Sequence, residues 1–407
     1  MKKSRIVLIF IVYTIIGIGV FSLLMFNQTK QADKRYGEYE DKLGKADSKI
    51  EKMENELQEA ENKLDEANDR IDNQNEEMSS MNNNIKELEV SLDEANDKIS
   101  VYEDANYGIK AYGRLSVNGT KLCSENGEQV QLKGMSTHGI TWYPRYTNGA
   151  TIKQLKDSGA NVIRLAVYSD QNDSYLYKAE ENMNYLYNAI ENALVQNMYV
   201  IIDWHVLRDE NPNVHKEKAI EFFEEVTKHY GNNKGIIYEI CNEPNGGTTW
   251  DEIYKYATEI IPIIRKNAKD AVIIVGTPEN SFDVEDVLEK PLSFENVMYA
   301  FHVYIDVTDK NVAGLNWLKR KLDVALPIFV TEWGIEDVEN EGAKLYKEKA
   351  VAFIDMMKER GISWCNWSLS NKDEIHSMFK PGCNKYSGWT EDDLTFSGKI
   401  VLEGLEN

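Results

Sequence analysis

The stretch Ile236-Ile-Tyr-Glu-Ile-Cys-Asn-Glu-Pro-Asn245 shows the pattern on which the fold prediction for this chain rests. It begins as an apolar run, which is typical of a buried β-strand, and it ends in polar residues and a proline. Similar runs recur along the chain, separated by amphipathic stretches such as Glu217–Tyr230 and Trp250–Asn267. The eight runs are Val130–Met135, Asn161–Val167, Tyr199–Asp203, Ile236–Ile240, Ala271–Val275, Val297–Phe301, Pro327–Thr331 and Ile362–Trp367.

Apolar strands that alternate with helices predict a parallel sheet covered on both faces. Eight such units in roughly 300 residues fit a (β/α)8 barrel, whose usual size is about 250 residues or more. A doubly wound open sheet is the alternative, but eight repeats without a glycine-rich phosphate loop favour the barrel. The sequence therefore predicts an α/β protein with a (β/α)8 TIM barrel over residues 108–407.

The N-terminal segment carries a membrane-spanning pattern. Lys2, Lys3 and Arg5 precede Ile6–Phe26, a run of 21 residues without a formal charge. At about 1.5 Å per residue this helix is long enough to cross a hydrocarbon core, and the charges before it favour a cytoplasmic N-terminus. Residues 1–29 are predicted to be a cytoplasmic tip and a signal-anchor helix, with the remainder outside the cell. A cleaved signal peptide is the alternative, although the run lacks a small-x-small site at its end.

Residues 30–107 carry a heptad pattern that predicts a coiled-coil stalk. With position a at Ile50 and position d at Met53, the alternation never slips from Tyr36 to Tyr102. Of its 20 a and d positions only Gln74 is polar. A helix with this stripe cannot bury it alone, so we expect a homo-oligomer through the stalk. A single charged helix or a disordered acidic spacer is the alternative.

Charge and cysteine content exclude some classes of protein. The net charge is −22, and residues 33–104 contribute 23 acidic and 10 basic side chains. Phosphate binding needs clustered Lys and Arg, so nucleic acid is not an expected partner. Four cysteines form no disulfide framework, and we interpret Cys241 and Cys365 as buried thiols. A bridge between Cys123 and Cys383 stays open.

Polar and aromatic residues end most of the predicted strands. In a (β/α)8 barrel the carboxyl ends of the strands meet at one rim, where active sites are built. The chain places there Thr137-His138-Gly139, Arg164, Asp203-Trp204-His205, Asn242-Glu243-Pro244, His302 with Tyr304, Glu332-Trp333-Gly334, and Asn366-Trp367-Ser368.

Glu243 and Glu332 both follow an apolar run directly. Carboxylates at such positions are costly unless they find partners or serve a purpose. Two carboxyl groups that face each other across a cleft are what cleavage of a glycosidic bond requires. A zinc site built from these residues with His205 and His302 competes with this interpretation. However, the sequence contains no HExxH motif or short-spaced ligand pair, so we expect no metal and no cofactor.

Residues 113–405 resemble the family 5 glycoside hydrolases, especially the bacterial endoglucanase branch. The stretch 236–245 fits the signature around that family's acid/base, and Thr331-Glu-Trp-Gly334 follows further along the chain, with Glu332 89 residues after Glu243. Further matches lie in Leu132–Gly139, Asn161–Leu165, Val200–His205 and Asn366–Ser370.

The resemblance implies a retaining mechanism with Glu243 as acid/base and Glu332 as nucleophile. It places Arg164 and Tyr304 beside Glu332, and Asn242 at the 2-hydroxyl of the sugar. His205 and His302 would line the subsite of the cleaved sugar, and Trp367 would form its floor. The positions that match glucan contacts further along the cleft are His138, Trp142, Tyr168, Lys372 and Glu374.

The chain departs from the family pattern on the leaving-group side. Asn280 stands where the family often has a Trp, within Thr277-Pro-Glu-Asn-Ser-Phe282, and the loop Ile305–Lys310 lacks the expected small, polar composition. The expected function is a membrane-tethered endo-β-1,4-glucanase with an extracellular catalytic domain. A β-mannanase, a mixed-linkage glucanase, an inactive carbohydrate-binding surface protein, or a stalk that is itself the functional part are the alternatives.

Overall fold

The computed structural model describes residues 2–104, 107–306, 315–336 and 343–406. The chain divides into two compact units, Met1–Asp97 and Lys98–Asn407.

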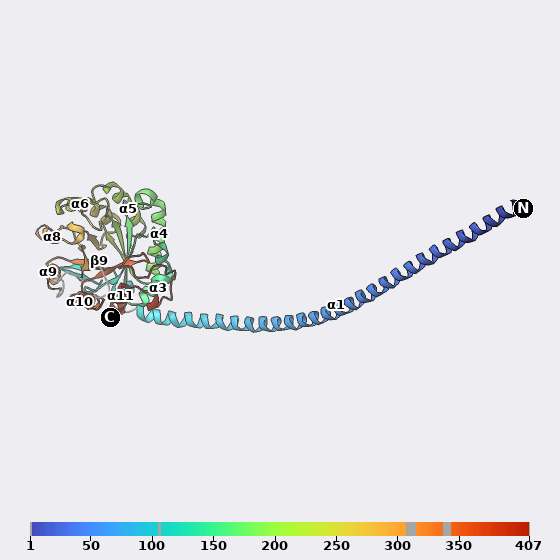
Figure 1. The fold of residues 1–407 in the computed structure, drawn as a ribbon. Helices are drawn as coiled ribbons and strands as arrows, with labels where there is room; N and C mark the ends of the chain where they lie inside the picture. Colours follow the sequence, from blue (N-terminus) through green and yellow to red (C-terminus); the bar gives the residue numbers. More distant parts are fainter. Residues whose placement is uncertain (1, 105–106, 307–314, 337–342, 407) are drawn as a thin grey trace. The chain divides into compact units, whose positions relative to one another are not determined.

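Helix α1 (Lys2–Asp104) provides the first unit (Figure 1). The predicted anchor and stalk segments are therefore both helical. Within the described residues, one helix is long and apolar enough to cross a membrane, and its apolar part lies near the N-terminus. The large heptad side chains from Leu43 to Leu88 are 51–69% exposed on the single chain. The heptad side chains from Leu92 onward lie outside the described residues.

Eight parallel strands form a closed barrel in the second unit, in the order β10-β3-β4-β5-β6-β7-β8-β9. All eight predicted runs contribute a strand to this barrel, so the fold prediction is confirmed. The strands are β3 (Lys133–Thr137), β4 (Val162–Tyr168), β5 (Tyr199–His205), β6 (Ile236–Glu239), β7 (Ile273–Val275), β8 (Val297–Asp306), β9 (Ile328–Glu336) and β10 (Trp364–Leu369).

Helices follow the strands and surround the barrel (Figure 1). The amphipathic pattern of the longer helices explains this placement, because they present an apolar face to the outside of the sheet. They are α3 (Gly149–Asp157), α4 (Tyr175–Val195), α5 (Lys216–Tyr230), α6 (Trp250–Asn267), α7 (Pro278–Ser281), α8 (Glu285–Glu289), α9 (Asn316–Leu322), α10 (Ala343–Arg360) and α11 (Phe396–Glu406).

The period of two along each strand separates the inside of the barrel from the helix layer. On β5, Val200, Ile202 and Trp204 pack in the large cluster under the helices, while Tyr199 and Ile201 belong to the smaller cluster inside the barrel. The side chains that alternate with the helix-facing set reach the rim further along the strand. The sequence therefore predicts which residues on each strand can enter the site.

A layer of charged side chains lies inside the barrel above this apolar interior. On β4, Val162 belongs to the interior cluster, and Arg164 follows two residues later. On β6, Ile237 and Glu239 have the same relationship. Both charged side chains are fully buried, so they require partners.

Strand β9 contains one extra residue relative to both neighbours. Ala300 pairs with Phe329 and His302 with Glu332, so two steps along β8 correspond to three along β9. Such a bulge re-aims side chains and is common beside active sites. Here it lets consecutive residues, Thr331 and Glu332, both bond to groups inside the barrel.

The sequence did not predict the hairpin β1 (Ser116–Asn118) and β2 (Lys121–Cys123). Strands of three residues are too short to show an alternating pattern. Leu122 of this hairpin packs in the interior cluster. Cys241 and Cys365 are buried free thiols as expected, and Cys123 and Cys383 are also free.

Candidate active site

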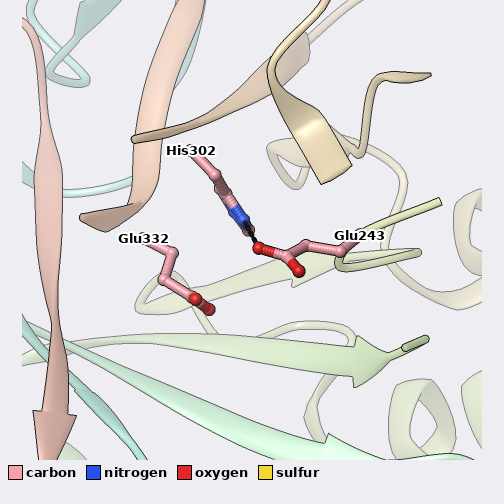
Figure 2. A group of neighbouring side chains, drawn as sticks. All are labelled: Glu243, His302 and Glu332. Atoms are coloured by element: carbon pink, nitrogen blue, oxygen red, sulfur yellow. Dashed lines mark hydrogen bonds and ion pairs between the residues drawn. The ribbon is translucent and has the colours of Figure 1, made fainter. Parts of the chain in front are cut away.

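The predicted catalytic carboxyl groups lie close together at the C-terminal rim. One oxygen each of Glu243 and Glu332 and a ring nitrogen of His302 all lie within 4.8 Å of one another. Figure 2 shows the two carboxyl groups on facing elements, with the imidazole beside Glu243. Retaining glycosidases hold their two carboxyl groups about 5–5.5 Å apart, whereas inverting enzymes need about 6.5–9.5 Å. The separation between Glu243 and Glu332 is closer to the shorter of these two distances.

Glu332 accepts two hydrogen bonds. Arg164 donates from Nη1 to Oε2 at 3.1 Å, and Tyr304 donates its hydroxyl to Oε1 at 2.6 Å. Burial raises the pKa of Glu332 to about 7, with a further contribution from the charge of Glu243, while His302, Arg164 and Tyr304 act in the opposite direction. Both predicted neighbours of Glu332 are therefore in contact with it.

Glu243 has a different environment. His302 Nδ1 lies 2.9 Å from Oε1, and Asn280 donates from Nδ2 to Oε2 at 3.2 Å. Burial raises the pKa of this carboxyl group as well. Because burial raises both pKa values, the hydrogen-bond partners decide which carboxyl group holds the proton. Glu332 faces a cation and a phenol, which stabilise a carboxylate.

A chain of hydrogen bonds defines the proton positions at His302. Thr331 donates its one hydroxyl proton to Oε1 of Glu239 at 2.8 Å, so its oxygen must accept from His302 Nε2, also at 2.8 Å. Burial lowers the pKa of His302 to about 4, so the ring is neutral and its Nδ1 carries no proton. Nδ1 can therefore only accept, and it pairs with a protonated Oε1 of Glu243.

Arg164 is the hub of a buried network. Its Nε lies 2.7 Å from Oε2 of Glu239, and Nη2 lies 3.0 Å from Oδ2 of Asp203. Nη2 also donates to Oδ1 of Asn242 at 2.6 Å. Together with Glu332, one guanidinium thus contacts three carboxyl groups. This geometry needs the planar fork of Arg, which an ammonium group does not supply.

Asn242 and His205 are oriented by the same network. Because Oδ1 of Asn242 accepts from Arg164, its Nδ2 faces Nε2 of His205 at 3.2 Å. His205 then donates from Nδ1 to Asp203 at 2.6 Å. Burial lowers the pKa of His205 and raises that of Asp203 to about 7, opposed by Arg164. Both residues predicted to contact the cleaved sugar are therefore held rigidly.

Aromatic rings form one wall of the site. Trp367 lies 5.5 Å from the ring of His205, which it stacks against, and 5.1 Å from that of His138. Tyr168 packs against Trp142 at 4.7 Å between ring centroids. These predicted sugar-contacting residues form one continuous surface that begins at Tyr304, which bonds to Glu332.

Lys372 and Glu374 extend this surface. Lys372 Nζ lies 2.6 Å from Oε2 of Glu374 and 3.2 Å from Nε2 of His138. Within the described residues, Oε1 of Glu374 is buried and has no hydrogen-bond partner. It is an acceptor that a sugar hydroxyl can satisfy. The structure thus brings together every predicted site residue.

The leaving-group side differs from the family pattern as the sequence indicated. Asn280 contacts Glu243 directly, whereas Phe282 packs against Phe301 and Trp317 with ring centroids 5.5 and 5.7 Å apart. Phe282 is therefore part of the packing and does not replace the missing Trp. The predicted loop change at 305–310 falls largely on residues 307–314, which lie outside the described residues.

Three contributors were missed as site residues. Asp203, Glu239 and Thr331 all lie inside the barrel and bond to predicted site residues. The available signal was a charged residue inside an apolar run, as in Ile236-Ile-Tyr-Glu239. Such a residue must find a buried partner.

Distance alone would allow Glu243, His302 and Glu332 to hold a metal ion. His205, the fourth residue of the zinc interpretation, is outside this group, and its two ring nitrogens contact Asp203 and Asn242. In the present arrangement Nδ1 of His302 faces Glu243, and Arg164 and Tyr304 bond to Glu332. The expectation of a metal-free site stays a prediction.

A (β/α)8 barrel with two close, unequal carboxyl groups and an aromatic wall at its C-terminal rim defines a glycoside hydrolase. The family model "Cellulase (glycosyl hydrolase family 5)" matches residues 123–373. The chain belongs to glycosyl hydrolase family 5, as its motifs predicted.

Characterised relatives agree with this assignment. The chain is 44% identical over 303 residues to Endoglucanase A of Butyrivibrio fibrisolvens, a match that covers 73% of this chain and 70% of the relative. It is 41% identical over 296 residues to an endoglucanase of Clostridium saccharobutylicum, with 72% and 65% covered. The catalytic domain of the Thermobifida fusca endoglucanase Cel5A superposes with a TM-score of 0.67 at 35% identity, covering 74% of this chain and 99% of that domain.

Proposed function

We propose that this chain is a membrane-tethered, retaining endo-β-1,4-glucanase in which Glu243 is the acid/base and Glu332 the nucleophile. The observation that carries the proposal is the unequal pairing of two close carboxyl groups. Glu332 accepts from Arg164 and Tyr304, whereas Glu243 faces the bare Nδ1 of His302. One carboxyl group is thus prepared as an anion and the other as an acid.

The reaction follows from this division. In the first step Glu332 attacks the anomeric carbon while the glycosidic C–O bond breaks. The leaving oxygen takes the proton of Glu243, which becomes a carboxylate. In the second step this carboxylate removes a proton from water, the water oxygen attacks the glycosyl carbon, and the bond to Glu332 breaks. Both carboxyl groups then regain their starting states.

The neighbouring residues act on the sugar at the point of cleavage. Asn242 is held by Arg164 with its amide near His205, a position suited to the 2-hydroxyl of the sugar. Contacts to this hydroxyl strengthen in the transition state. Trp367 stacks against the ring of His205 beside this position, and we infer that it forms the floor of the subsite.

A β-1,4-glucan is the proposed substrate class. The relatives named above are endoglucanases, and a related Thermobifida fusca catalytic domain has been solved in complex with cellotetraose. The wall of Trp142, Tyr168 and Trp367 suits stacking on an extended, equatorially linked chain. Mannan and mixed-linkage glucan also contain β-1,4 linkages, so they are the competing substrates in the test.

The test measures reducing-sugar release by the full-length chain in detergent from soluble β-1,4-glucan, mannan, mixed-linkage glucan and xylan. Glu243→Gln and Glu332→Gln are matched controls, because each keeps the shape of the side chain and removes the acid/base in one case and the nucleophile in the other. We expect glucan hydrolysis that falls by at least about 10³-fold in both variants. NMR of the first products should show the β-anomer. An α-product, strong mannan hydrolysis, or a folded but inactive chain would each contradict the proposal.

Residues 1–29 are proposed to anchor the enzyme in the cell membrane as a single-pass segment with the barrel outside. The support is the apolar helix near the N-terminus, preceded by Lys2, Lys3 and Arg5. Expression of the chain with and without residues 1–29 tests this, because loss of the segment should move the barrel to the soluble fraction. Protease added to intact cells should reach the barrel. If the barrel resisted that protease, it would lie on the cytoplasmic side, which would contradict the proposed orientation.

Residues 30–107 are proposed to be a self-associating stalk. Its heptad side chains between Leu43 and Leu88 are more than half exposed on one chain. Sedimentation of a chain without residues 1–29 should give an oligomer, and further deletion of residues 36–102 should give a monomer. An equal number of chains per particle before and after the second deletion would refute self-association.

A further inference from the structure

The turn after β7 is hydrogen-bonded to the segment that carries Glu243. Ser281 donates its hydroxyl to the carbonyl oxygen of Asn242 at 2.5 Å, and the backbone N–H of Asn280 donates to the carbonyl oxygen of Pro244 at 3.0 Å. The side chain of Asn280 reaches Oε2 of Glu243 at 3.2 Å. Two neighbouring residues thus bond to three consecutive residues around this carboxyl group.

The turn has an unusual backbone. Glu279, Asn280 and Ser281 have φ values of 54°, 59° and 61°, which form a left-handed turn built from residues with side chains. This conformation is sterically unfavourable for L-residues, and glycine is the residue that avoids the cost. Strain of this kind persists where the surrounding contacts enforce it, and it concentrates at functional sites. Two of these three residues, Asn280 and Ser281, are the ones that bond to the Glu243 segment.

The two oxygens of Glu243 face opposite kinds of partner. Oε1 faces Nδ1 of His302, which accepts, and Oε2 faces Nδ2 of Asn280, which can only donate. A proton on Oε2 would point at another donor, so the protonated form carries its proton on Oε1.

We propose that Asn280 is a positioning residue for the acid/base, holding Oε2 of Glu243 as an acceptor and stabilising the carboxylate that forms when the proton leaves Oε1. The inference rests on the proposed role of Glu243. As the glycosidic C–O bond breaks, the leaving oxygen takes the proton and the O–H bonding pair stays on Glu243. The hydrogen bond from Asn280 becomes charge-assisted at that point, so it contributes more in the transition state than before it.

This assignment also explains what replaces the missing Trp. An aromatic ring at position 280 would supply a stacking face for the leaving sugar. The amide at this position acts on the proton donor itself. The chain therefore gives up a sugar-binding contact on this side and gains a contact that favours proton release.

The test compares the full-length enzyme in detergent with Asn280→Ala and Asn280→Asp on aryl β-cellobiosides. A dinitrophenyl leaving group departs without a proton, whereas a phenyl leaving group needs one. We expect Asn280→Ala to lower kcat/KM about 10-fold for the phenyl substrate and about 2-fold or less for the dinitrophenyl substrate. The alkaline limb of kcat/KM should move up by about one pH unit, and further in Asn280→Asp, because an added negative charge disfavours the carboxylate.

Two controls keep the outcomes distinct. Glu279→Gln changes an exposed side chain on the same turn, and it should leave both substrates and the pH profile within about 2-fold of wild type. Glu243→Ala should lose far more activity on the phenyl than on the dinitrophenyl substrate. If it does not, the role of Glu243 fails and the inference fails with it. If it does, equal losses on both substrates in Asn280→Ala, or an alkaline limb that stays in place, would overturn the role of Asn280 alone.

Discussion

Arg164 donates from Nε to Oε2 of Glu239 at 2.7 Å, and both side chains are fully buried inside the barrel. The same guanidinium reaches Glu332 from Nη1 at 3.1 Å. The charge of Arg164 is therefore shared between a carboxyl group that takes no part in the proposed chemistry and the proposed nucleophile. Glu239 thus influences how strongly Glu332 holds its proton, although the two carboxyl groups belong to different strands.

The substitution Glu239→Gln keeps the shape of the side chain and removes its charge. Arg164 then acts more fully on Glu332, and a negative charge is lost from its surroundings. Both effects lower the pKa of Glu332, so the acidic limb of kcat/KM should move down by about half to one pH unit. The pH profile on a soluble cellooligosaccharide measures this shift.

Glu285→Gln is the matched control, because Glu285 is an exposed carboxyl group paired with Lys321 on the surface. It should leave the acidic limb in place. Movement of the limb upward in Glu239→Gln would show that Glu239 supports the nucleophile by another route. Glu239→Ala should in addition lower the free energy of unfolding by about 3–5 kcal/mol, because Arg164 loses a buried partner.

Tyr304→Phe should move the same limb in the opposite direction. Its hydroxyl donates to Oε1 of Glu332 at 2.6 Å and so stabilises the carboxylate. Without this donor the pKa of Glu332 rises, and the acidic limb should move up by about one pH unit, since hydrogen bonds to charged groups contribute about 1.5–3 kcal/mol. We expect kcat to fall about 10- to 100-fold. A limb that moves down, or does not move, would contradict this account of Glu332.

The fold could be predicted from the sequence because the same pattern of strand and helix recurs along the chain. Eight apolar runs separated by amphipathic stretches specify strand and helix types even where single boundaries differ by a few residues. Ile236–Ile240, for example, contributes β6 (Ile236–Glu239). The site residues were readable because barrel strands bring their carboxyl ends to one rim, so motifs far apart in the chain converge.

The details that sequence could not supply depend on register and on contacts. The bulge in β9, which lets Thr331 and Glu332 both enter the barrel, has no pattern of its own. Position 280 was recognised as unusual, but its contact with Glu243 depends on the left-handed turn that carries it. The place of Glu239 inside an apolar run indicates that it needs a buried partner, but only the structure identifies that partner as Arg164.

Stability should depend on pH through Glu332. Burial raises its pKa from the ordinary value of 4.5 to about 7 in the folded chain. Below about pH 4.5 the group is protonated in both states. As the pH rises to 7, the unfolded chain loses its proton first, so the folded state loses stability. Glu332→Gln is neutral throughout, so it should be more stable than wild type at pH 8 by about 1–3 kcal/mol, and by less at pH 5.

Tryptophan fluorescence measures this difference cleanly, because all 8 tryptophans lie after residue 108 and report only on the barrel. Thermal unfolding of wild type and Glu332→Gln at pH 5 and pH 8 gives the comparison. An equal advantage at both values, or a larger one at pH 5, would contradict the raised pKa. Asp203→Asn provides a second case with the same sign, since burial raises the pKa of Asp203 to about 7.

Glu374 allows binding of the glucan chain to be separated from catalysis. Glu374 holds Lys372 through Oε2 at 2.6 Å, and its buried Oε1 lacks a partner within the described residues. It lies along the aromatic wall, beyond His138, away from the reacting carboxyl groups. Glu374→Gln should raise KM for cellooligosaccharides about 10-fold and leave kcat nearly unchanged, because the contact is equal in ground state and transition state. A fall in kcat with an unchanged KM would instead show that Glu374 acts in the transition state. If the substitution changed neither kcat nor KM on short or on long oligosaccharides, Glu374 would not belong to the binding surface.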